Sequence, residues 1–474
     1  MMPDTNLTLL TPDLCVIGAG SAGLSLAAGA VQLGASVVLI EGGEMGGDCL
    51  NHGCVPSKAL IAAAHAAQAV RRGGPGVAGQ DPQIDFAGVM AHVRRSIAAI
   101  APHDSEARFT GLGVTVIRDW AGFTGPHEIT VGATRIRARR VVLATGSRPR
   151  IPDLPGLGSV AYHTNETLFD LTECPAHLLI LGGGPIGCEI AQAFRRLGAE
   201  VTLIQSRSIL PREDPAAVAL IRAELAAEGV RVIEGATVSH AAPGPSLTLE
   251  TGETLTGSHL LIAVGRAPVH DRLNLAAAGI AATAKGIITD RHLRTTNRKV
   301  FAIGDVAGRE QFTHVAGYHA GLVVRRALFG LPAPLRADHI PRVTYTGLEL
   351  AQVGLTEAEA RNKHGTALEV VDMPFAKNDR AITEARTNGF LKVMMHKGRP
   401  IGATLIGPGA GDLITPWSLA LATRLKMSAI SGLITAYPTR SDITKAAVSA
   451  YYSPRLFANP WVKRMVSAVQ HFLP

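Results

Sequence analysis

Residues 14–23 read LCVIGAGSAG, an apolar run that ends in the glycine spacing G-x-G-x-x-G. An Ala-rich segment follows, and then a second apolar run, VVLI, which ends in Glu41. This order predicts a buried strand, a glycine turn, a helix and a parallel strand, the βαβ unit that binds dinucleotides. Gly18 turns the chain tightly, Gly20 lets a pyrophosphate approach the backbone, and Gly23 packs the helix against the strand. The N-terminus of that helix would face the phosphates.

The same pattern recurs at residues 178–187, which read LLILGGGPIG and precede another apolar run that ends in Gln205. The motif glycines of this second copy are Gly182, Gly184 and Gly187. One glycine motif alone is weak evidence, because glycine-rich turns are common. Two copies, each between a predicted strand and a predicted helix, indicate two dinucleotide-binding units.

The two copies differ where their second strand ends. Glu41 can accept hydrogen bonds from a ribose 2′-hydroxyl. Gln205 holds that place in the second copy and is followed by Ser206 and Arg207. An uncharged amide beside an arginine admits a 2′-phosphate that a carboxylate would repel, so we expect the second unit to prefer NADPH over NADH. The alternative is that Arg207 only faces solvent.

The composition bounds the class of protein. A length of 474 residues corresponds to about three domains. Hydrophobic residues make up 47% of the chain, which excludes a disordered protein, and aromatic residues only 4%, so an aliphatic core is expected. The net charge is +8 without a run of five or six like charges. Nucleic-acid binding is therefore not expected, and a solvated face or an anionic cofactor accounts for the excess positive charge more simply.

Two stretches bear on the compartment. Met1–Thr11 has no cationic start followed by an apolar run, so it does not resemble a signal peptide. The longest apolar stretch, residues 24–40, is short and contains polar residues, so no integral membrane segment is expected. We expect a cytoplasmic protein.

The pattern of predicted strands and helices changes after about residue 340. Strands are predicted at residues 342–346, 389–395 and 400–406, and a helix at residues 413–425. They indicate a separate α+β domain behind a Pro-punctuated linker at residues 331–341.

The tail at residues 461–472 has the pattern of a short amphipathic helix. Its apolar residues Trp461, Met465 and Ala468 or Val469 are expected to pack on the parent domain. The alternative is contact with a membrane.

The most informative stretch for chemistry is GGDCLNHGCVPSK at residues 46–58, five positions past the second strand of the first unit. Cys49 and Cys54 are slightly too far apart for a disulfide within a regular helix. Gly53 and Pro56 supply a local distortion that could close the gap. A helix that begins near Pro56 would place its positive end at the thiols and lower the pKa of one of them.

Three interpretations of this pair are open: a redox-active disulfide, a metal site that includes His52, and two inert cysteines. The spacing does not match a zinc site and no fourth ligand lies nearby, so we favour the redox disulfide and expect no metal. Lys58, four residues after Cys54, would share its helix face. Cys15 and Cys188, inside a predicted strand and a predicted helix, are interpreted as small core residues.

Three further motifs complete a recognisable order along the chain: ATGSRP at residues 144–149, AVGRAP at 263–268 and VFAIGD at 300–305. Together with the glycine turns and the cysteine stretch, this order resembles the class I pyridine nucleotide–disulfide oxidoreductases. That family includes dihydrolipoamide dehydrogenase, glutathione reductase and mercuric reductase. The resemblance extends from about Leu10 to Tyr452.

The resemblance implies an α/β fold with two Rossmann-like dinucleotide-binding domains, for FAD and NAD(P)H, and a C-terminal α+β dimerisation domain. It also implies a homodimer in which each active site forms between two subunits. The expected segments are 10–155 and 285–335 for the FAD domain, 156–284 for the NAD(P)H domain, 340–455 for the dimerisation domain and 456–474 for the amphipathic tail.

The resemblance also implies roles for single residues. Cys54 would be the charge-transfer thiolate nearer the flavin, and Cys49 the interchange thiol that attacks substrate. Lys58 and Glu189 match the family's ion pair beside the flavin N5. The expected cofactor-binding residues are Gly18, Gly20, Gly23, Glu41, Lys58, Gly146, Asp305, Thr313, His314, Gly182, Gly184, Gly187, Gln205, Arg207 and Gly265.

The sequence departs from dihydrolipoamide dehydrogenases and glutathione reductases at their C-terminal acid/base motif, His-Pro-x-x-x-x-Glu. Tyr437 replaces the histidine and Asp442 replaces the glutamate. The side chain of tyrosine has a pKa of about 10, so it is a poor base at neutral pH. General acid/base catalysis typically contributes ~10²–10⁴-fold to the reaction rate. Efficient turnover of lipoamide or glutathione is therefore not expected. Mercuric reductases resemble this chain in the tyrosine but end in a vicinal cysteine pair, whereas the last cysteine here is Cys188.

The sequence thus predicts an FAD-dependent NAD(P)H:disulfide oxidoreductase. Electrons would pass from NAD(P)H through FAD and the pair Cys49 and Cys54 to a small-molecule or protein disulfide, or to another thiol-reactive acceptor. One alternative is a metal-ion reductase similar to mercuric reductase. Another is a docking component of a multienzyme complex, similar to dihydrolipoamide dehydrogenase.

Overall fold

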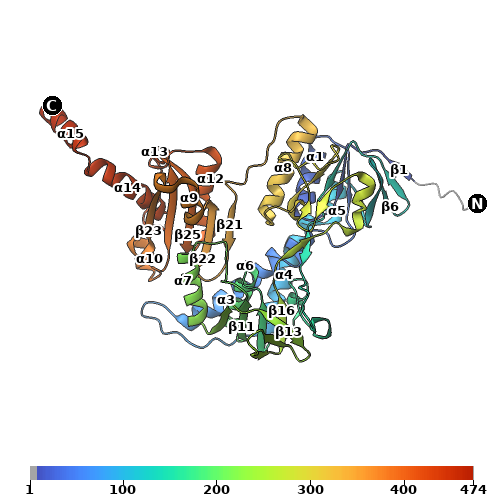
Figure 1. Cartoon of the computed structure of the whole chain (residues 1–474), viewed down its shortest axis with the longest axis horizontal. Helices are drawn as coiled ribbons and strands as arrows, with labels where there is room; N and C mark the ends of the chain where they lie inside the picture. The colour runs from blue at the N-terminus through green and yellow to red at the C-terminus, as the bar shows by residue number, and fades with distance from the viewer. Residues whose placement is uncertain (1–7, 473–474) are drawn as a thin grey trace, which may run out of the picture.

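A parallel sheet of five strands, in the order β20-β8-β2-β3-β4, forms the centre of the first unit in the computed structural model. The structure describes residues 8–472, so most of Met1–Thr11 and the last two residues of the expected tail lie outside it. The strands are β2 (Leu14–Ile17), β3 (Val37–Ile40), β4 (Thr115–Ile117), β8 (Arg140–Leu143) and β20 (Val300–Ala302). Helices α1 (Ser21–Gln32) and α8 (Thr313–Phe329) pack side by side in this unit, which Figure 1 shows with α5 (Glu106–Gly111).

Alternate residues of β2 enter two different cores, because successive side chains of a strand point to opposite faces. Leu14 and Val16 pack in the cluster that contains α1 and α8. Cys15 and Ile17 pack on the other face, in a cluster with the small sheet β1-β7-β6-β5. Cys15 is fully buried, which confirms its expected place in the core. That small sheet consists of β1 (Thr8–Leu10), β5 (Ala121–Gly125), β6 (Glu128–Val131) and β7 (Thr134–Ile136).

The second unit repeats the arrangement of the first. Its parallel sheet has the order β12-β11-β10-β16, which matches the order β4-β3-β2-β8 of the first unit. These strands are β10 (His177–Leu181), β11 (Glu200–Gln205), β12 (Val230–Glu234) and β16 (His259–Ile262). The unit also contains α6 (Pro185–Arg196), α7 (Pro215–Ala227) and the sheet of β13 (Val238–Ala242), β14 (Ser246–Leu249) and β15 (Thr254–Thr256). The two βαβ units predicted from the glycine motifs are both present.

Two antiparallel strands, β9 (Ser147–Pro149) and β17 (Arg266–Pro268), pair where the chain passes between the first two units. Residues 282–287 form a further hairpin, β18 (Ala282–Thr283) and β19 (Gly286–Ile287). Leu273, Ala278 and Ile280, which precede that hairpin, pack in the core of the first unit. The expected boundaries between the domains remain predictions.

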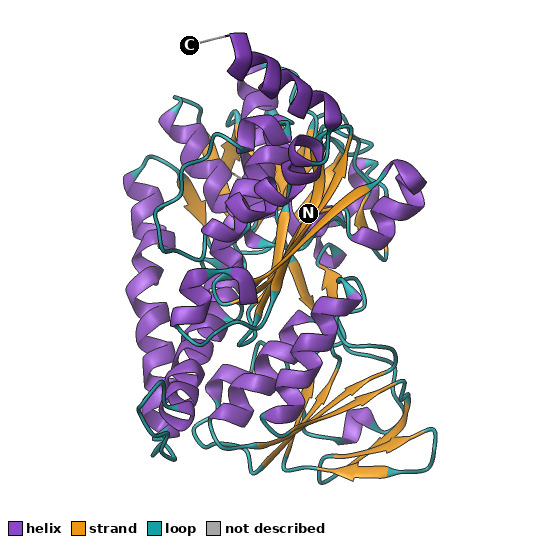
Figure 2. Ribbon diagram, turned by 90° about the vertical axis from the view of Figure 1, so that its left-hand side faces the viewer, coloured by secondary structure: helices purple, strands orange, loops and turns teal. Residues whose placement is uncertain are grey.

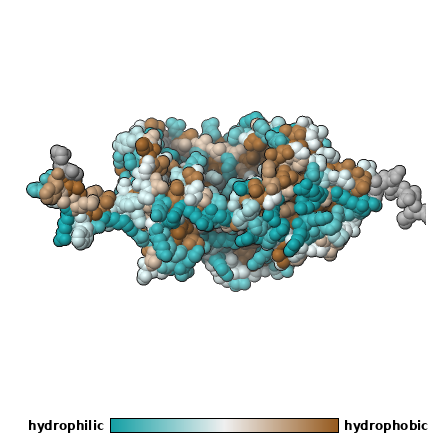
Figure 3. All heavy atoms as spheres, turned by 90° about the horizontal axis from the view of Figure 1, so that it is seen from above, coloured by the Kyte–Doolittle hydropathy of each residue, from teal (hydrophilic) through white to brown (hydrophobic). Residues whose placement is uncertain are grey.

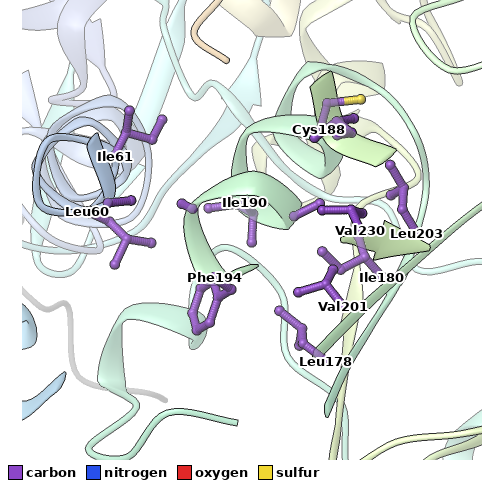
Figure 4. Packing of buried hydrophobic residues seen from close by; sticks show 14 of the residues in the cluster. Leu60, Ile61, Leu178, Ile180, Cys188, Ile190, Phe194, Val201, Leu203 and Val230 are labelled. Carbon is purple, nitrogen blue, oxygen red and sulfur yellow. The ribbon is translucent and has the colours of Figure 1, made fainter. Parts of the chain in front are cut away.

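A helical hairpin ties the cysteine stretch to the second unit. It consists of α3 (Cys54–Arg72) and α4 (Phe86–Asp104), and α3 packs against α6. Figure 4 shows Leu60 and Ile61 of α3 near Ile190 and Phe194 of α6, in a cluster that continues into β10 and β11. Cys188 of α6 is fully buried in the same cluster, which confirms its interpretation as a core residue.

The third unit is an antiparallel sheet in the order β21-β22-β25-β24-β23. Its strands are β21 (Pro341–Thr344), β22 (Glu349–Gly354), β23 (Glu369–Pro374), β24 (Phe390–His396) and β25 (Arg399–Gly407). Its helices are α9 (Glu357–His364), α10 (Asp379–Thr383), α11 (Ala410–Leu413), α12 (Thr415–Thr423), α13 (Met427–Ile430) and α14 (Asp442–Phe457). The single helix expected at residues 413–425 is therefore α12 preceded by the short α11. In each of the three units, helices pack against sheets (Figure 2), and the expected fold class is confirmed.

The helix predicted at residues 461–472 is present as α15 (Pro460–Phe472), but it does not pack on the parent domain. Trp461 is 75% exposed, Met465 61% and Val469 42%, and no residue of α15 is buried. Figure 1 shows that α15 extends away from the third unit beyond the end of α14. The packing expected from the sequence was wrong. Within residues 8–472, no helix has the length and apolar character needed to cross a membrane.

Candidate active site

A cleft of about 2560 Å³ runs along the carboxyl ends of the strands in both parallel sheets. The loops after β2, β3, β8 and β20 line it from the first unit, and the loops after β10 and β16 from the second. Ligands of open α/β sheets bind at this edge, because the loops that connect strands to helices gather there. The cleft also reaches residues 342–345 of the third unit.

The first glycine turn is shaped by backbone packing. Gly18 has a φ of +107°, and a Cβ built on it would lie 2.4 Å from the carbonyl oxygen of Ala144. A Cβ on Gly23 would lie 1.8 Å from the carbonyl oxygen of Gly18. Gly20 immediately precedes α1 and lines the cleft, and no side chain caps the amides of this helix end. Those amides are suited to binding an anionic group.

The second turn has the same construction. Gly182 has a φ of +117°, and a Cβ on it would lie 2.4 Å from the carbonyl oxygen of Ala263. A Cβ on Gly187 would lie 1.8 Å from the carbonyl oxygen of Gly182. Gly184 precedes α6, whose N-terminus also has no side-chain cap. Gly184 lines the cleft, as do two other glycines expected to bind cofactor, Gly146 and Gly265. A Cβ on any of these three would meet no protein atom within 4 Å.

Glu41 directly follows β3, and Gln205, the last residue of β11, occupies the equivalent place in the second unit. Glu41 accepts hydrogen bonds from the amides of Ala19 (2.6 Å) and Gly43 (2.7 Å). Gln205 accepts one from the amide of Gly183 (2.8 Å) through Oε1. Both side chains line the cleft. Arg207 is exposed and does not line it.

The cysteine stretch folds into two helices. Cys49 lies in α2 (Gly47–Asn51), and α3 begins at Cys54 itself, two residues before the expected start at Pro56. The distortion between the cysteines is at Gly53, where a Cβ would lie 2.9 Å from the carbonyl oxygen of Asp48. Pro56 continues α3 without disruption, because an amide in the first turn has no partner within the helix.

Cys49 and Cys54 are free thiols that line the cleft, which is the reduced form of the predicted pair. The pKa of Cys54 is lowered to about 6. The largest cause is a hydrogen bond from the Cys49 thiol, followed by a hydrogen bond from Thr313 and the positive charge of Lys58. The Cys54 Sγ lies 3.3 Å from the Thr313 Oγ1. The same thiol–thiol hydrogen bond, with burial, raises the pKa of Cys49. Cys54 is therefore the thiolate of the pair at neutral pH, and Cys49 carries the proton.

Lys58 and Glu189 form the expected ion pair, with 2.8 Å between the Lys58 Nζ and the Glu189 Oε2. Glu189 of α6 is only 5% exposed, and its second oxygen accepts a hydrogen bond from the Tyr345 amide (2.9 Å). The Lys58 ammonium also lies 4.6 Å from the centre of the Tyr345 ring. The pair therefore joins α3, α6 and the loop after β21, beside the cysteines.

Asp305 and Arg266 belong to one polar network in the cleft. Asp305 accepts a 2.5 Å hydrogen bond from the Ser147 hydroxyl, and burial raises the pKa of its carboxyl group. Arg266 donates to the Ser147 Oγ (2.7 Å) and lies 3.1 Å from the Asp48 Oδ1. Arg266 belongs to the AVGRAP motif, but no role for it was predicted from the sequence. Its position directly after a predicted strand and a glycine turn is the sequence feature that could have indicated a place in the cleft.

Thr313 and His314 begin α8 and line the cleft as expected. The His314 Nε2 lies 2.8 Å from the carbonyl oxygen of Pro341. Burial lowers the pKa of this histidine, so its imidazole is neutral at pH 7.

Tyr437 and Asp442 lie apart from the cleft of their own chain. Tyr437 is 75% exposed, and its hydroxyl donates to the Asp379 Oδ2 (3.0 Å). This hydrogen bond raises the pKa of Tyr437. Asp442 accepts hydrogen bonds from the Thr435 hydroxyl and the Thr439 amide. One chain therefore does not bring these two residues to the cysteine pair.

Among residues 8–472, no group of three or more His, Cys, Asp and Glu side chains is arranged to hold a metal ion. The expectation of no resident metal remains a prediction.

Comparisons with known proteins agree with this geometry. Residues 12–320 match the pyridine nucleotide-disulphide oxidoreductase family, and residues 340–448 match its dimerisation domain. A mercuric reductase of Streptomyces lividans is 34% identical over 93% of this chain and 96% of its own length. A dihydrolipoyl dehydrogenase of Geobacillus stearothermophilus is 34% identical over 92% of this chain and 95% of its own.

Two solved structures are also similar. One is the Cu(II) complex of the HOCl-induced flavoprotein disulfide reductase RclA from Escherichia coli, with a TM-score of 0.82 and 29% identity over 92% of this chain and 99% of its own. The other is LpdA from Mycobacterium tuberculosis, with a TM-score of 0.84 and 27% identity over 93% of this chain and 99% of its own.

The chain belongs to the pyridine nucleotide–disulfide oxidoreductase family, as its motifs predicted. It is a flavin-dependent NAD(P)H oxidoreductase that acts on sulfur groups. Family membership implies FAD and NAD(P)H as cofactors, and the dimerisation domain supports a homodimer.

Proposed function

We propose that this enzyme reduces a disulfide or another thiol-reactive acceptor with electrons from NADPH, and that Cys49 and Cys54 carry those electrons to the acceptor. The observation that carries this proposal is the asymmetry of the pair in the cleft. Cys54 has a pKa lowered to about 6, whereas the pKa of Cys49 is raised. One thiolate and one thiol within hydrogen-bonding distance are the reduced partners that thiol–disulfide exchange requires.

The first glycine turn fits the pyrophosphate of FAD, because Gly20 and the uncapped end of α1 face the cleft. Glu41 would hold the adenosine ribose, and Asp305 the ribitol or pyrophosphate region. The open space beside Gly146 supports close approach by a bound group. Bound FAD would supply hydride acceptance from the nicotinamide and two-electron transfer to the disulfide.

Exchange begins with a proton shift between the two sulfur atoms. Cys49 gives its proton to the Cys54 thiolate across their hydrogen bond and becomes the nucleophile. It attacks one sulfur of the acceptor R–S–S–R, so a mixed disulfide forms and RS⁻ leaves. RS⁻ takes the proton from Cys54, and the Cys54 thiolate then attacks Cys49. This step releases the second RS⁻, which takes a proton from solvent, and forms the Cys49–Cys54 disulfide. The acceptor gains two electrons, and the pair loses two.

Lys58 holds negative charge at the Cys54 end of the pair. Its ammonium is fixed by Glu189 at 2.8 Å and lies over the Tyr345 ring. Because Glu189 is almost fully buried and bonded to the Tyr345 amide, the position of Lys58 is set by packing between units. We assign Lys58 and Glu189 to the face of the pair where the flavin would lie.

Gln205 supports the preference for NADPH. Its Oε1 holds the Gly183 amide in the same way that Glu41 holds the Ala19 amide, but it brings no negative charge. A 2′-phosphate at this place would meet an amide group, with the exposed Arg207 two residues away. NADH would meet no charge repulsion at this place, but it has no 2′-phosphate to pair with Arg207.

Tyr437 and Asp442 bear on the acceptor. We propose that they approach the cysteine pair of the other subunit in a homodimer, since they lie outside the cleft of their own chain. A tyrosine whose pKa is raised stays protonated at pH 7, so it does not accept a proton, and it is a poor proton donor to a leaving thiolate. This favours acceptors whose leaving thiolate needs little protonation and disfavours lipoamide. We therefore rank the reductase function above a docking role in a multienzyme complex.

A second candidate is metal-ion reduction. It is favoured by the similarity to mercuric reductases and by the RclA structure, which is a Cu(II) complex. Cys49 and Cys54 are the cysteines that line the cleft among residues 8–472, so the described part of the chain offers no third thiol to receive a metal ion there. We therefore rank this function second.

An acceptor screen tests the proposal. NADPH-reduced enzyme would be mixed anaerobically with lipoamide, glutathione disulfide, an aromatic disulfide, a small quinone or Hg(II), and reoxidation would be followed. We expect the aromatic disulfide, which has a good leaving thiolate, to react fastest, and Cys49→Ser to abolish that reaction. Cys174→Ser, outside the cleft, is the matched control and should keep it. A Cys49→Ser enzyme that turns over the disulfide normally would refute the proposal, and fastest reoxidation by Hg(II) would favour the second candidate.

A further inference from the structure

The exposed helix α15 divides cleanly into two faces. Trp461, Met465, Val469 and Phe472 follow one another at intervals of four, four and three residues, which places them on one side of a helix. Their exposed fractions are 75%, 61%, 42% and 79%. A contiguous exposed stripe of large apolar side chains marks an interaction site, whereas single exposed apolar residues do not.

The other face is cationic. It carries Lys463, Arg464 and His471, and α15 contains no Asp or Glu. The apolar surface continues into the end of α14, where Leu456 is 46% and Phe457 71% exposed. Figure 3 shows apolar and polar atoms side by side on the end of the molecule that projects beyond the third unit.

We propose that α15 binds the surface of a bilayer that contains anionic phospholipid. Aromatic residues on the apolar face, lysine and arginine on the polar face, and the absence of acidic residues are the features of a helix that lies in the interface plane. Its 13 residues extend about 20 Å, which is too short to cross a hydrocarbon core. The enzyme would thus sit on the membrane surface with its cleft in water.

Charge favours this occupant over a second copy of the chain. A protein partner would have to supply acidic groups to the cationic face and an apolar groove to the other face. An anionic membrane supplies both at once: phosphate groups for Lys463 and Arg464, and acyl chains for Trp461 and Phe472. The contribution of each cation at such a surface corresponds to about a fivefold change in binding.

Vesicle flotation with the full-length, flavin-loaded enzyme tests the proposal. The vesicles would be phosphatidylcholine alone, or equal parts phosphatidylcholine and phosphatidylglycerol. We expect binding to the mixed vesicles, weaker binding at high salt, and little binding to phosphatidylcholine alone. The double variant Lys463→Gln/Arg464→Gln should bind the mixed vesicles about 25-fold less tightly.

The matched control is Arg94→Gln/Arg95→Gln, which neutralises two adjacent exposed arginines on α4 and should bind within about twofold of wild type. Trp461→Ala/Phe472→Ala should bind the mixed vesicles less tightly by about tenfold or more, because it removes two large apolar side chains from the contact surface. Because α15 has no buried residue, these variants should keep their flavin and their circular dichroism.

Trp461 provides an independent signal. Its fluorescence should shift to shorter wavelength on addition of mixed vesicles, and the shift should vanish in Trp461→Phe, which retains Trp120 and Trp417. Three outcomes would overturn the proposal: no binding to mixed vesicles, undiminished binding by both tail double variants, or conversion of the dimer to a monomer by Trp461→Ala/Phe472→Ala. The last result would show that the apolar face packs on a second copy.

Discussion

Replacing Thr313 by valine removes a hydroxyl that lies 3.3 Å from the Cys54 sulfur while keeping the shape of the side chain. With a pKa of about 6, about nine-tenths of Cys54 is thiolate at pH 7, against about one-hundredth for the ordinary value of 9.0. A hydrogen bond to a charged group is worth ~1.5–3 kcal/mol. Cys54 is exposed, so the lower end applies, which corresponds to about one pH unit.

The thiolate of Thr313→Val should therefore form about one pH unit higher than in wild type, and only about half of it should be present at pH 7. The assay is a pH titration of the two-electron-reduced flavoprotein, followed by its long-wavelength thiolate–flavin absorbance. This band should grow as pH rises through about 6 in wild type. Thr237→Val, elsewhere in the same cleft, is the matched control and should leave the midpoint unchanged.

Two results would contradict the expected pKa of Cys54. A wild-type midpoint near the ordinary thiol value would mean that the Cys49 hydrogen bond and Lys58 do not stabilise the thiolate. An unchanged midpoint in Thr313→Val would mean that the hydroxyl does not donate to the sulfur. In either case the assignment of Cys54 as the thiolate of the reduced pair would fail.

The remaining predictions concern the nucleotide, the acceptor and the fold. Gln205→Glu should raise the KM for NADPH tenfold or more by charge repulsion and leave the KM for NADH nearly unchanged in steady-state assays; equal effects on both would contradict the 2′-phosphate argument. Tyr437→His should increase lipoamide turnover at least about tenfold, and no gain would mean that pocket shape is limiting. Gly53→Ala should lower the free energy of unfolding by ~1–3 kcal/mol in denaturant titrations, because its Cβ would lie 2.9 Å from Asp48, whereas Gly74→Ala meets no atom and should be near neutral.

Much of the fold could be predicted because its signals are local. The glycine spacing at Gly18 and Gly182 requires positive φ and close backbone contact, which few residues other than glycine allow. The buried strands on either side are continuous apolar runs, as parallel sheets require. The place of Cys15 and Cys188 in the core follows from the same patterns.

Other features depend on contacts that no local pattern encodes. The role of Arg266 comes from its convergence with Ser147 and Asp48, more than one hundred residues away in sequence. The exposure of α15 reflects the lack of a facing groove in the third unit, and an amphipathic pattern cannot distinguish a helix packed on its own domain from one that awaits a partner.

We propose that Cys49 and Cys54 form the disulfide that passes electrons from nucleotide to acceptor. This is tested by peptide mapping of oxidised enzyme before and after anaerobic addition of one equivalent of NADPH, with free thiols alkylated at each stage. We expect a Cys49–Cys54 disulfide before NADPH and two alkylated thiols after it, with Cys15, Cys174 and Cys188 unchanged. Finding both cysteines already alkylated in the oxidised enzyme, or no new thiols after NADPH is consumed, would contradict this proposal.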